Sequence, residues 1–214
     1  MADVARTVVR PEYSAFAKNL IAVLDSSFEL ATRNRPVIAV GGESGSGKST
    51  TAATLSRELT ASGRLSMVLH QDDYFRLPPR ANHAHRELTV AHVGPHEVDL
   101  DRMSSVIRAF RAGDAVDVPE VDYDADAFRV RRADFSNTQI LVVEGTYVLT
   151  LDAVDLRIFL EATWLDTRER RRARSRDVDS PFVDQVLEIE HRLIAPLAGV
   201  ADVLVDTEFR IRKR

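Results

Sequence analysis

The sequence predicts an α/β fold, a parallel sheet of about five strands with helices on both faces. Short apolar runs recur along its 214 residues, segments with helical spacing separate them, and a glycine ends two of those segments. The expected strands are residues 37–40, 65–70, 140–143, 156–160 and 203–206. In a sheet of this kind, ligands bind at the carboxyl ends of the strands.

Three segments carry apolar residues at the spacing of a helix. The first lies within residues 1–35, which we expect to form a helical extension packed on a domain of residues 36–214. The second, 51–63, and the third, 99–113, each end at a glycine, the residue that most often follows a helix. Helices that alternate with strands in this way cover both faces of a parallel sheet.

The composition is that of an ordinary globular protein, with 44 % hydrophobic and 29 % charged residues. A net charge of −4 argues against nucleic acid as a partner, and the lack of cysteine excludes disulfides and thiolate chemistry. No apolar stretch approaches the ~18 residues of a membrane span, and no secretory signal is visible. We therefore expect a cytoplasmic protein without a membrane partner, and homo-oligomerisation stays open.

The most specific motif follows the first expected strand and reads G-x-x-x-x-G-K-[ST]. Its glycines let the backbone curl so that N–H groups point at phosphate oxygens, Lys48 reaches the β and γ phosphates, and Ser49 binds Mg²⁺. A flexible Gly/Ser turn is the alternative, which the strand before and the helix after disfavour. The motif predicts a P-loop NTPase fold that binds ATP. The expected nucleotide-binding residues are Gly42, Glu43, Ser44, Gly45, Ser46, Gly47, Lys48, Ser49 and Thr50.

Carboxylates follow two further strands, where the sheet places ligands. Asp72 and Asp73 come after the second strand, and phosphoryl transfer to an alcohol needs one carboxylate to accept the hydroxyl proton. A solvated acidic turn or a helix cap is the alternative for this pair. Glu144 closes the third strand and is a candidate to hold Mg²⁺ together with Ser49, or else to cap a neighbouring backbone group.

An arginine-rich segment follows the fourth strand, with arginines at 168, 170, 171, 172, 174 and 176. Guanidinium groups match phosphate oxygens, so an Arg-rich lid here would close over ATP and stabilise transition-state charge. We expect Arg172 to act in catalysis and Arg174 and Arg176 to bind the nucleotide, while the others are solvated or paired with acids. A nucleic-acid patch is the competing interpretation.

Two polar segments are candidates for the acceptor side. Residues 114–126 are rich in acids around Tyr123 and form either a solvated acidic loop or part of an acceptor pocket. Residues 70–96 hold five of the six histidines and are expected to form a polar loop over the acceptor; a zinc site is disfavoured because there is no cysteine. The expected acceptor-binding residues are Asp73, Tyr74, Phe75 and Tyr123.

Four segments together resemble the uridine kinase, nicotinamide riboside kinase and phosphoribulokinase family of P-loop small-molecule kinases. They are GGESGSGKST, HQDDYF, ILVVEGTYVL, and the arginine-rich segment followed by IEHRLIAPLAGVADVLVD. The resemblance implies that Asp72 rather than Asp73 is the catalytic base and that Glu144 assists the metal. It also assigns phosphate binding to Gly45, Gly47, Lys48, Ser49 and Thr50.

The sequence departs from the uridine kinase pattern on the acceptor side. Phe128 stands where those enzymes have a pyrimidine-contacting histidine, and Val93 stands where their F-D-H-P segment has a sugar-binding aspartate. Their R-G-R lid motif is replaced by residues 177–181, DVDSP. The Q-D-D-aromatic-F run and the Asp-Ser-Pro are more similar to nicotinamide riboside kinases.

The sequence thus predicts an ATP- and Mg²⁺-dependent kinase that phosphorylates a hydroxyl of a small nucleoside- or sugar-like metabolite, in the manner of a uridine kinase. The alternatives are a nicotinamide riboside kinase-like or other small-metabolite kinase and, in a different class, a regulatory nucleotide-hydrolysing switch. The sequence contains no Asn-Lys-x-Asp run of a guanine-reading switch, which favours the kinase.

Overall fold

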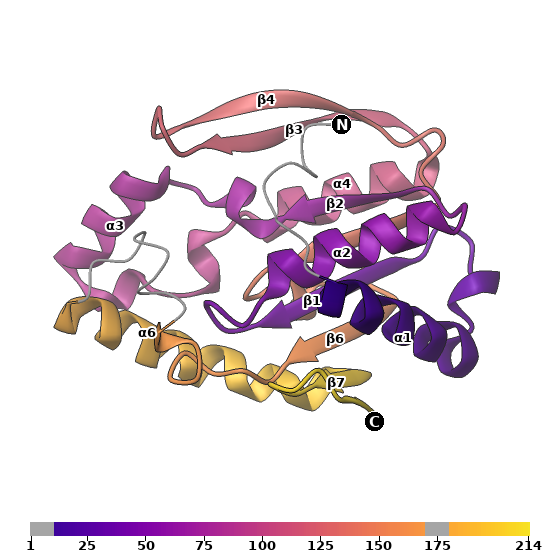
Figure 1. The fold of residues 1–214 in the computed structure, drawn as a ribbon. Helices are drawn as coiled ribbons and strands as arrows, with labels where there is room; N and C mark the ends of the chain where they lie inside the picture. Colours follow the sequence, from indigo (N-terminus) through magenta and orange to yellow (C-terminus); the bar gives the residue numbers. More distant parts are fainter. Residues whose placement is uncertain (1–10, 170–179) are drawn as a thin grey trace.

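A computed structural model describes residues 11–169 and 180–214. Its centre is a six-stranded sheet in the order β2-β5-β1-β6-β7-β8 (Figure 1). The parallel strands are β1 (Val37–Gly42), β2 (Ser66–His70), β5 (Ile140–Glu144), β6 (Leu156–Leu160) and β7 (Val203–Val205). The edge strand β8 (Ile211–Lys213) runs antiparallel to β7 and was not predicted, because it has a single apolar residue. The predicted α/β fold with a parallel sheet is confirmed.

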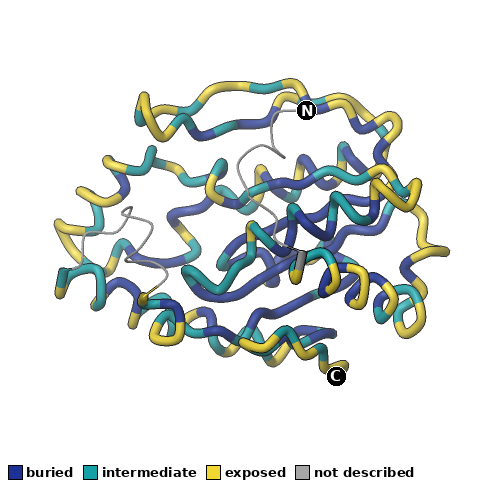
Figure 2. Tube along the Cα trace, viewed as in Figure 1, coloured by how far each residue is buried: buried dark blue, intermediate teal, exposed yellow. Residues whose placement is uncertain are grey.

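Helices cover both faces of the sheet. Helices α1 (Pro11–Phe28) and α2 (Lys48–Ala61) pack on one face, and α4 (Leu100–Ala112) packs on the other. Alternate residues of β1 serve the two faces: Ile38 lies in the apolar cluster of α1 and α2, and Val37 lies in that of α4. Both cores are closed to solvent, as the dark central strands of Figure 2 show.

Helix α1 shares a core with helix α2. Its residues Leu20 and Leu24 are fully buried in one apolar cluster with Leu55 and Leu59 of α2. Apolar side chains at this spacing lie on one side of a helix, which explains why α1 forms and where it docks. The division of the chain into an extension and a domain stays a prediction.

A separate β-hairpin lies over α4, at the top of Figure 1. It consists of β3 (Ala115–Asp122) and β4 (Ala127–Asp134) and occupies most of the acidic segment that sequence analysis left as a loop or a pocket. The acids of β3 are cross-strand partners of arginines, for example Asp117 with Arg132 at 3.0 Å. This pairing offsets the like charges and allows a strand to form where the composition suggests a solvated loop.

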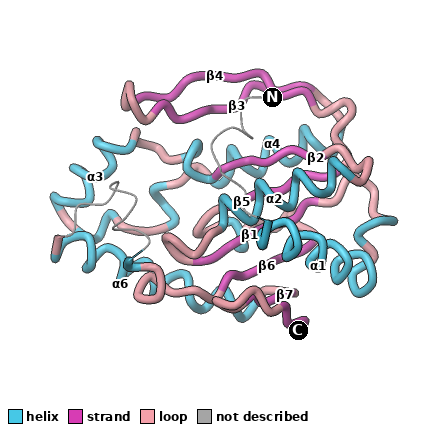
Figure 3. Tube along the Cα trace, viewed as in Figure 1, coloured by secondary structure: helices cyan, strands magenta, loops and turns pink. Residues whose placement is uncertain are grey.

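The histidine-rich stretch is largely helical, so its description as a polar loop was wrong (Figure 3). It contains η3 (Gln71–Tyr74), α3 (Pro79–Leu88), η4 (Val90–His92) and η5 (Pro95–Glu97). Pro79 stands at the first position of α3, where its missing N–H costs no hydrogen bond. Few apolar residues mark this helix, and ion pairs described below hold it in place instead.

The remaining elements lie before β1 or in the connections between the later strands. They are η2 (Leu30–Thr32), η6 (Val148–Thr150), α6 (Pro181–Ile194) and η7 (Ala195–Val200). Ser180 caps α6, because its Oγ accepts a hydrogen bond from the backbone N–H of Val183 at 3.3 Å. Among the described residues, no helix is both long and apolar enough to span a membrane.

Candidate active site

The loop between β1 and α2 has the geometry of a phosphate cradle. Its chain reverses through Gly47, whose φ of 101° is open to glycine at little cost, and α2 begins at Lys48. The positive N-terminal end of α2 and its free N–H groups therefore face the loop. The Lys48 Nζ donates to the backbone oxygen of Glu43 at 2.9 Å, which holds the ammonium group across the loop. The loop and helix offer an anion site for a nucleotide.

Oxygen ligands suited to Mg²⁺ lie next to this loop. The Ser49 Oγ donates to the Oε1 of Glu144 at 3.2 Å, and Glu144 is buried at the carboxyl end of β5. A hydroxyl and a carboxylate fit Mg²⁺, which usually takes one or two protein carboxylates and completes its shell with phosphates and water. These two residues would hold the ion, as the sequence predicted.

His70 is a site residue that sequence analysis did not single out. It is the last residue of β2, and its Nδ1 lies 2.7 Å from the Oε1 of Glu144. The register of the sheet pairs His70 with Glu144 directly, so this contact is a consequence of strand alignment. Because an ionised carboxylate only accepts hydrogen bonds, the Nδ1 carries the hydrogen and orients Glu144.

Asp72 is the acid that faces the metal and phosphate residues. Asp72 is an exposed residue, but the surrounding protein keeps water away from its carboxyl group, and the negative charge of Glu144 lies nearby. Both effects raise the pKa of Asp72. The charge of Lys48 opposes this shift, so all three groups share one region. The hydroxyl of Tyr123 in the hairpin loop donates to the Asp72 Oδ2 at 3.3 Å. The structure therefore brings together five predicted residues: Asp72, Lys48, Glu144 and Tyr123, with Ser49 beside Glu144.

The Asp73 carboxylate points towards strand β3 of the hairpin. Its Oδ1 accepts a hydrogen bond from the backbone N–H of Val121 at 2.8 Å, which ties η3 to strand β3. Two neighbouring acids thus have different surroundings, because successive residues of a tight helical turn point in different directions. Asp73 positions the hairpin, and Asp72 faces the phosphate loop.

A pocket of about 250 Å³ opens beside η3, between the hairpin and the start of α4. Its lining residues are Asp73, Tyr74, Phe75, Arg76, Asp99, Arg102, Pro119 and Phe128. Three of the four predicted acceptor-binding residues lie here, and Tyr123 does not line it. The Tyr74 hydroxyl is buried and has no hydrogen-bond partner among the described residues, and burial raises the pKa of Tyr74.

The predicted lid residues Arg172, Arg174 and Arg176 lie outside the described residues. Of the arginine-rich segment, the structure describes Arg168, whose guanidinium lies 3.1 Å from the Asp184 carboxylate of α6. Arg168 is thus one of the arginines that pair with an acid, as expected for part of this segment.

The turn that carries Asp72 is packed tightly against the end of β5. Gln71 is buried; its Nε2 donates to Thr146 Oγ1 at 2.9 Å, and its Oε1 accepts from the Tyr147 N–H at 2.7 Å. A Cβ at Gly145 would lie 2.3 Å from the Gln71 Cβ, closer than real side chains approach. Glycine at this position is therefore required for η3 to take its place.

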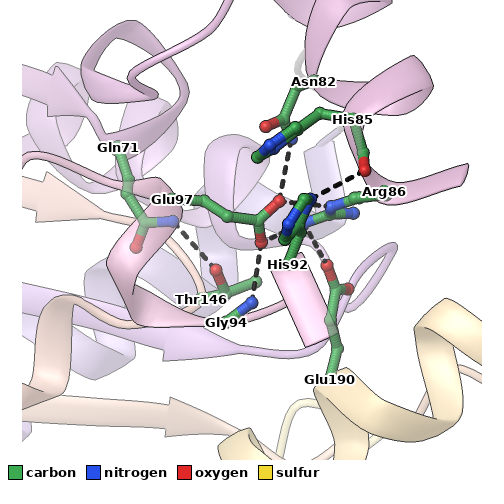
Figure 4. A network of polar contacts seen from close by, with 9 residues as sticks. All are labelled: Gln71, Asn82, His85, Arg86, His92, Gly94, Glu97, Thr146 and Glu190. Atoms are coloured by element: carbon green, nitrogen blue, oxygen red, sulfur yellow. Dashed lines mark hydrogen bonds and ion pairs between the residues drawn. The ribbon is translucent and has the colours of Figure 1, made fainter. Parts of the chain in front are cut away.

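A buried ion network joins α3 to η5 and α6 (Figure 4). Arg86 binds both oxygens of Glu97 at 2.6 and 2.8 Å and reaches Glu190 at 3.0 Å. Asn82 and the Gly94 N–H also donate to Glu97. Burial by itself would raise the pKa of Glu97, but these hydrogen bonds, led by that of Arg86, outweigh it and lower the pKa. Sequence analysis missed the network because its members lie far apart in the chain.

Comparison with known proteins agrees with this geometry. The profile of the phosphoribulokinase / uridine kinase family matches residues 37–179, which include the phosphate loop, Asp72 and Glu144. The chain belongs to that family. It therefore carries the fold and the ATP-dependent small-molecule kinase domain of the family.

Three similar proteins illustrate the range of the family. The bifunctional alpha-galactosidase/sucrose kinase AgaSK of Mediterraneibacter gnavus is 34 % identical over 172 residues, 73 % of this chain but 18 % of that protein. The uridine kinase of Mannheimia succiniciproducens is 27 % identical over 75 % of this chain and 77 % of its own length. The phosphoribulokinase structure from Rhodobacter spheroides superposes with a TM-score of 0.63 at 18 % identity, covering 81 % of this chain and 70 % of that one.

We predict that Gly145→Ala displaces η3 and with it Asp72. The added Cβ meets the Gln71 Cβ, and such overpacking costs about 1–3 kcal/mol of folding free energy. A small shift of a reacting group lowers kcat by roughly 10- to 100-fold. Urea unfolding and steady-state kinetics measure the two effects. Gly199→Ala is the matched control, because a Cβ there meets no atom within 4 Å; equal behaviour of the two variants would contradict the prediction.

We predict that Arg86→Met destabilises the protein by about 3–5 kcal/mol at pH 7, because the buried carboxylate of Glu97 and the partly buried carboxylate of Glu190 lose their partner. The lowered pKa of Glu97 means that its stabilising contribution is complete above about pH 4.3 and is lost as the pH falls through its folded-state pKa. Burial raises the pKa of Glu190. A neutral Glu190 depends less on the positive charge of Arg86 than an ionised Glu190 does.

The deficit of Arg86→Met should therefore narrow as the pH falls below about 4.3, which urea unfolding at a series of pH values from 7 down to about 3 measures. Arg192→Met removes an exposed pair with Glu188 and should change the unfolding free energy by less than about 0.5 kcal/mol. A deficit of Arg86→Met that is independent of pH would contradict the assignment.

Proposed function

We propose that this kinase transfers the γ-phosphate of ATP to a hydroxyl of a sugar- or nucleoside-like metabolite, with Asp72 as the general base. The observation that carries the proposal is the placement of Asp72 beside Lys48 and Glu144, at the mouth of the phosphate loop. A carboxylate in this position meets the acceptor hydroxyl and the transferred phosphate together. Its raised pKa makes it a better proton acceptor than an ordinary aspartate.

In the proposed reaction, an Asp72 oxygen accepts the proton of the acceptor hydroxyl. The acceptor oxygen forms its bond to the γ-phosphorus while the bond from phosphorus to the β–γ bridging oxygen breaks, and that oxygen leaves with ADP. Lys48 and the loop N–H groups hold the β and γ phosphates in line with the hydroxyl. Tyr123, which donates to Asp72, keeps the carboxylate facing the acceptor.

We infer that Ser49 and Glu144 hold Mg²⁺, with His70 fixing the orientation of Glu144. A bound Mg²⁺ neutralises charge on the phosphates. Arg172, Arg174 and Arg176 remain our candidates for further phosphate contacts. Glu144 and Asp72 carry like charges and lie near each other. The residues around Glu144 therefore also have to compensate the repulsion between these two carboxylates.

The pocket beside η3 is our candidate for the acceptor site, and its lining favours a sugar. Four charged side chains surround it, and two of them are the guanidinium groups of Arg76 and Arg102. Charged donors and acceptors suit a polyhydroxyl ligand, and about 250 Å³ is just below the range of roughly 300–1,000 Å³ for larger ligands. The relative with a sucrose kinase activity in its name also has a higher identity to this chain than the uridine kinase.

The acceptor class is tested by a coupled assay of ADP formation with uridine, nicotinamide riboside, pantothenate, sucrose and fructose. We expect a sugar to give the highest kcat/KM, with slow ATP hydrolysis when no acceptor is present. A higher kcat/KM for uridine would assign the pocket to a nucleoside. Hydrolysis that no acceptor accelerates would instead favour the nucleotide-hydrolysing switch.

We predict that Asp72→Asn lowers kcat by about 10²- to 10⁴-fold while ATP affinity is kept, because the amide does not accept the proton. The control is Asp152→Asn, which changes an exposed aspartate outside the pocket in the same way. Steady-state kinetics and calorimetric ATP binding separate the two effects. Full turnover of Asp72→Asn would show that another group is the base.

A further inference from the structure

The phosphate loop contains an acid that is buried within it. Glu43 follows the first glycine of the motif and is 4 % exposed. A buried carboxylate is costly unless donors surround it, and near a polyanion it also repels the ligand. The loop therefore has to compensate the negative charge of Glu43 in the region where it binds negatively charged phosphates.

Two donors from outside the loop bind the Glu43 carboxylate. The backbone N–H of Trp164 donates to Oε2 at 2.8 Å, and the Nδ1 of His191 lies 2.6 Å from Oε1. Because an ionised carboxylate only accepts, the His191 Nδ1 carries the hydrogen of this bond. Both oxygens of Glu43 are thus held on the side of the loop where Trp164 and His191 lie.

The backbone of Glu43 also determines where the catalytic lysine sits. Its carbonyl oxygen accepts from the Lys48 Nζ at 2.9 Å and from the Ser46 N–H at 3.1 Å. The next carbonyl, that of Ser44, accepts from the Thr167 hydroxyl at 3.1 Å. A change in the Glu43 side chain therefore acts on the same peptide that holds Lys48.

The residue that precedes His191 holds helix α6 in place. Glu190, which directly precedes His191, binds Arg86 of α3 at 3.0 Å. The side chain of His191 is 41 % exposed, so its position depends on the bond to Glu43 and on the placement of α6 rather than on burial. Two successive residues of α6 thereby connect α3 and the phosphate loop.

We propose that His191 is a positioning residue of the nucleotide site: it holds the Glu43 carboxylate away from the incoming triphosphate. Without His191, the carboxylate keeps one fixed donor and is free to turn, and its charge then opposes phosphate binding. The proposal concerns the nucleotide half of the site and holds whichever acceptor the enzyme uses.

The test is isothermal titration of the full-length protein with ATP and Mg²⁺ in the absence of any acceptor. His191→Ala should raise the Kd for ATP by about tenfold or more, which is about 1.4 kcal/mol. Glu43→Gln keeps an oxygen acceptor and removes the charge, so it is the background in which the loss of His191 is measured again. The double variant His191→Ala/Glu43→Gln should regain most of the lost affinity, because the unfavourable charge is gone.

Two further variants make the result specific. His191→Gln retains an N–H donor and should keep most of the affinity, whereas Arg192→Ala, the next residue of the same helix, should have no effect on it. If His191→Ala does not fold, His191→Asn, whose shorter side chain falls short of Glu43, replaces it with the same expected loss. Folded His191 variants that bind ATP within about twofold of the wild type, or a double variant no better than His191→Ala, would overturn the proposal.

Discussion

The alignment of three neighbouring parallel strands is the constraint on which the site depends. In the register of the sheet, Glu144 stands level with Val40 of β1 and with His70 of β2. The turn after β2 therefore starts level with Glu144, and β1 runs two residues further, to Gly42, before the phosphate loop begins. Asp72, Glu144 and the phosphate loop lie close together because these neighbouring strands end at the same edge of the sheet.

Negative charge is concentrated at this edge of the sheet, and the fold compensates each acid with a specific partner. His70 and Ser49 bind Glu144, Trp164 and His191 bind Glu43, and Tyr123 donates to Asp72. Burial and the nearby Glu144 raise the pKa of Asp72, as expected of an acid that accepts a proton.

The sequence predicted the parts of the site whose signal is local. The phosphate loop, the Asp72–Asp73 pair and Glu144 belong to short motifs at strand ends, and the family resemblance favoured Asp72 over Asp73. His70 and His191 were missed because their roles come from partners 74 and 148 residues away in the chain. The hairpin was missed for another reason. Its acids and arginines neutralise one another only when the two strands pair, and the sequence of either strand alone does not indicate this pairing.

The hairpin has a consequence for how such enzymes diversify. Pro119 and Phe128 form one wall of the pocket, yet they belong to a two-stranded sheet that shares no strand with the central one. Substitutions of these two residues would change the lining of the proposed acceptor pocket without changing the strands that precede the phosphate loop and end in Glu144. Hydrogen bonds from the Val121 N–H to Asp73, from the Tyr123 hydroxyl to Asp72 and from the Arg80 N–H to Asp126 hold the hairpin in place on the rest of the protein. The architecture thereby allows selection to exchange one substrate for another while phosphoryl transfer is conserved.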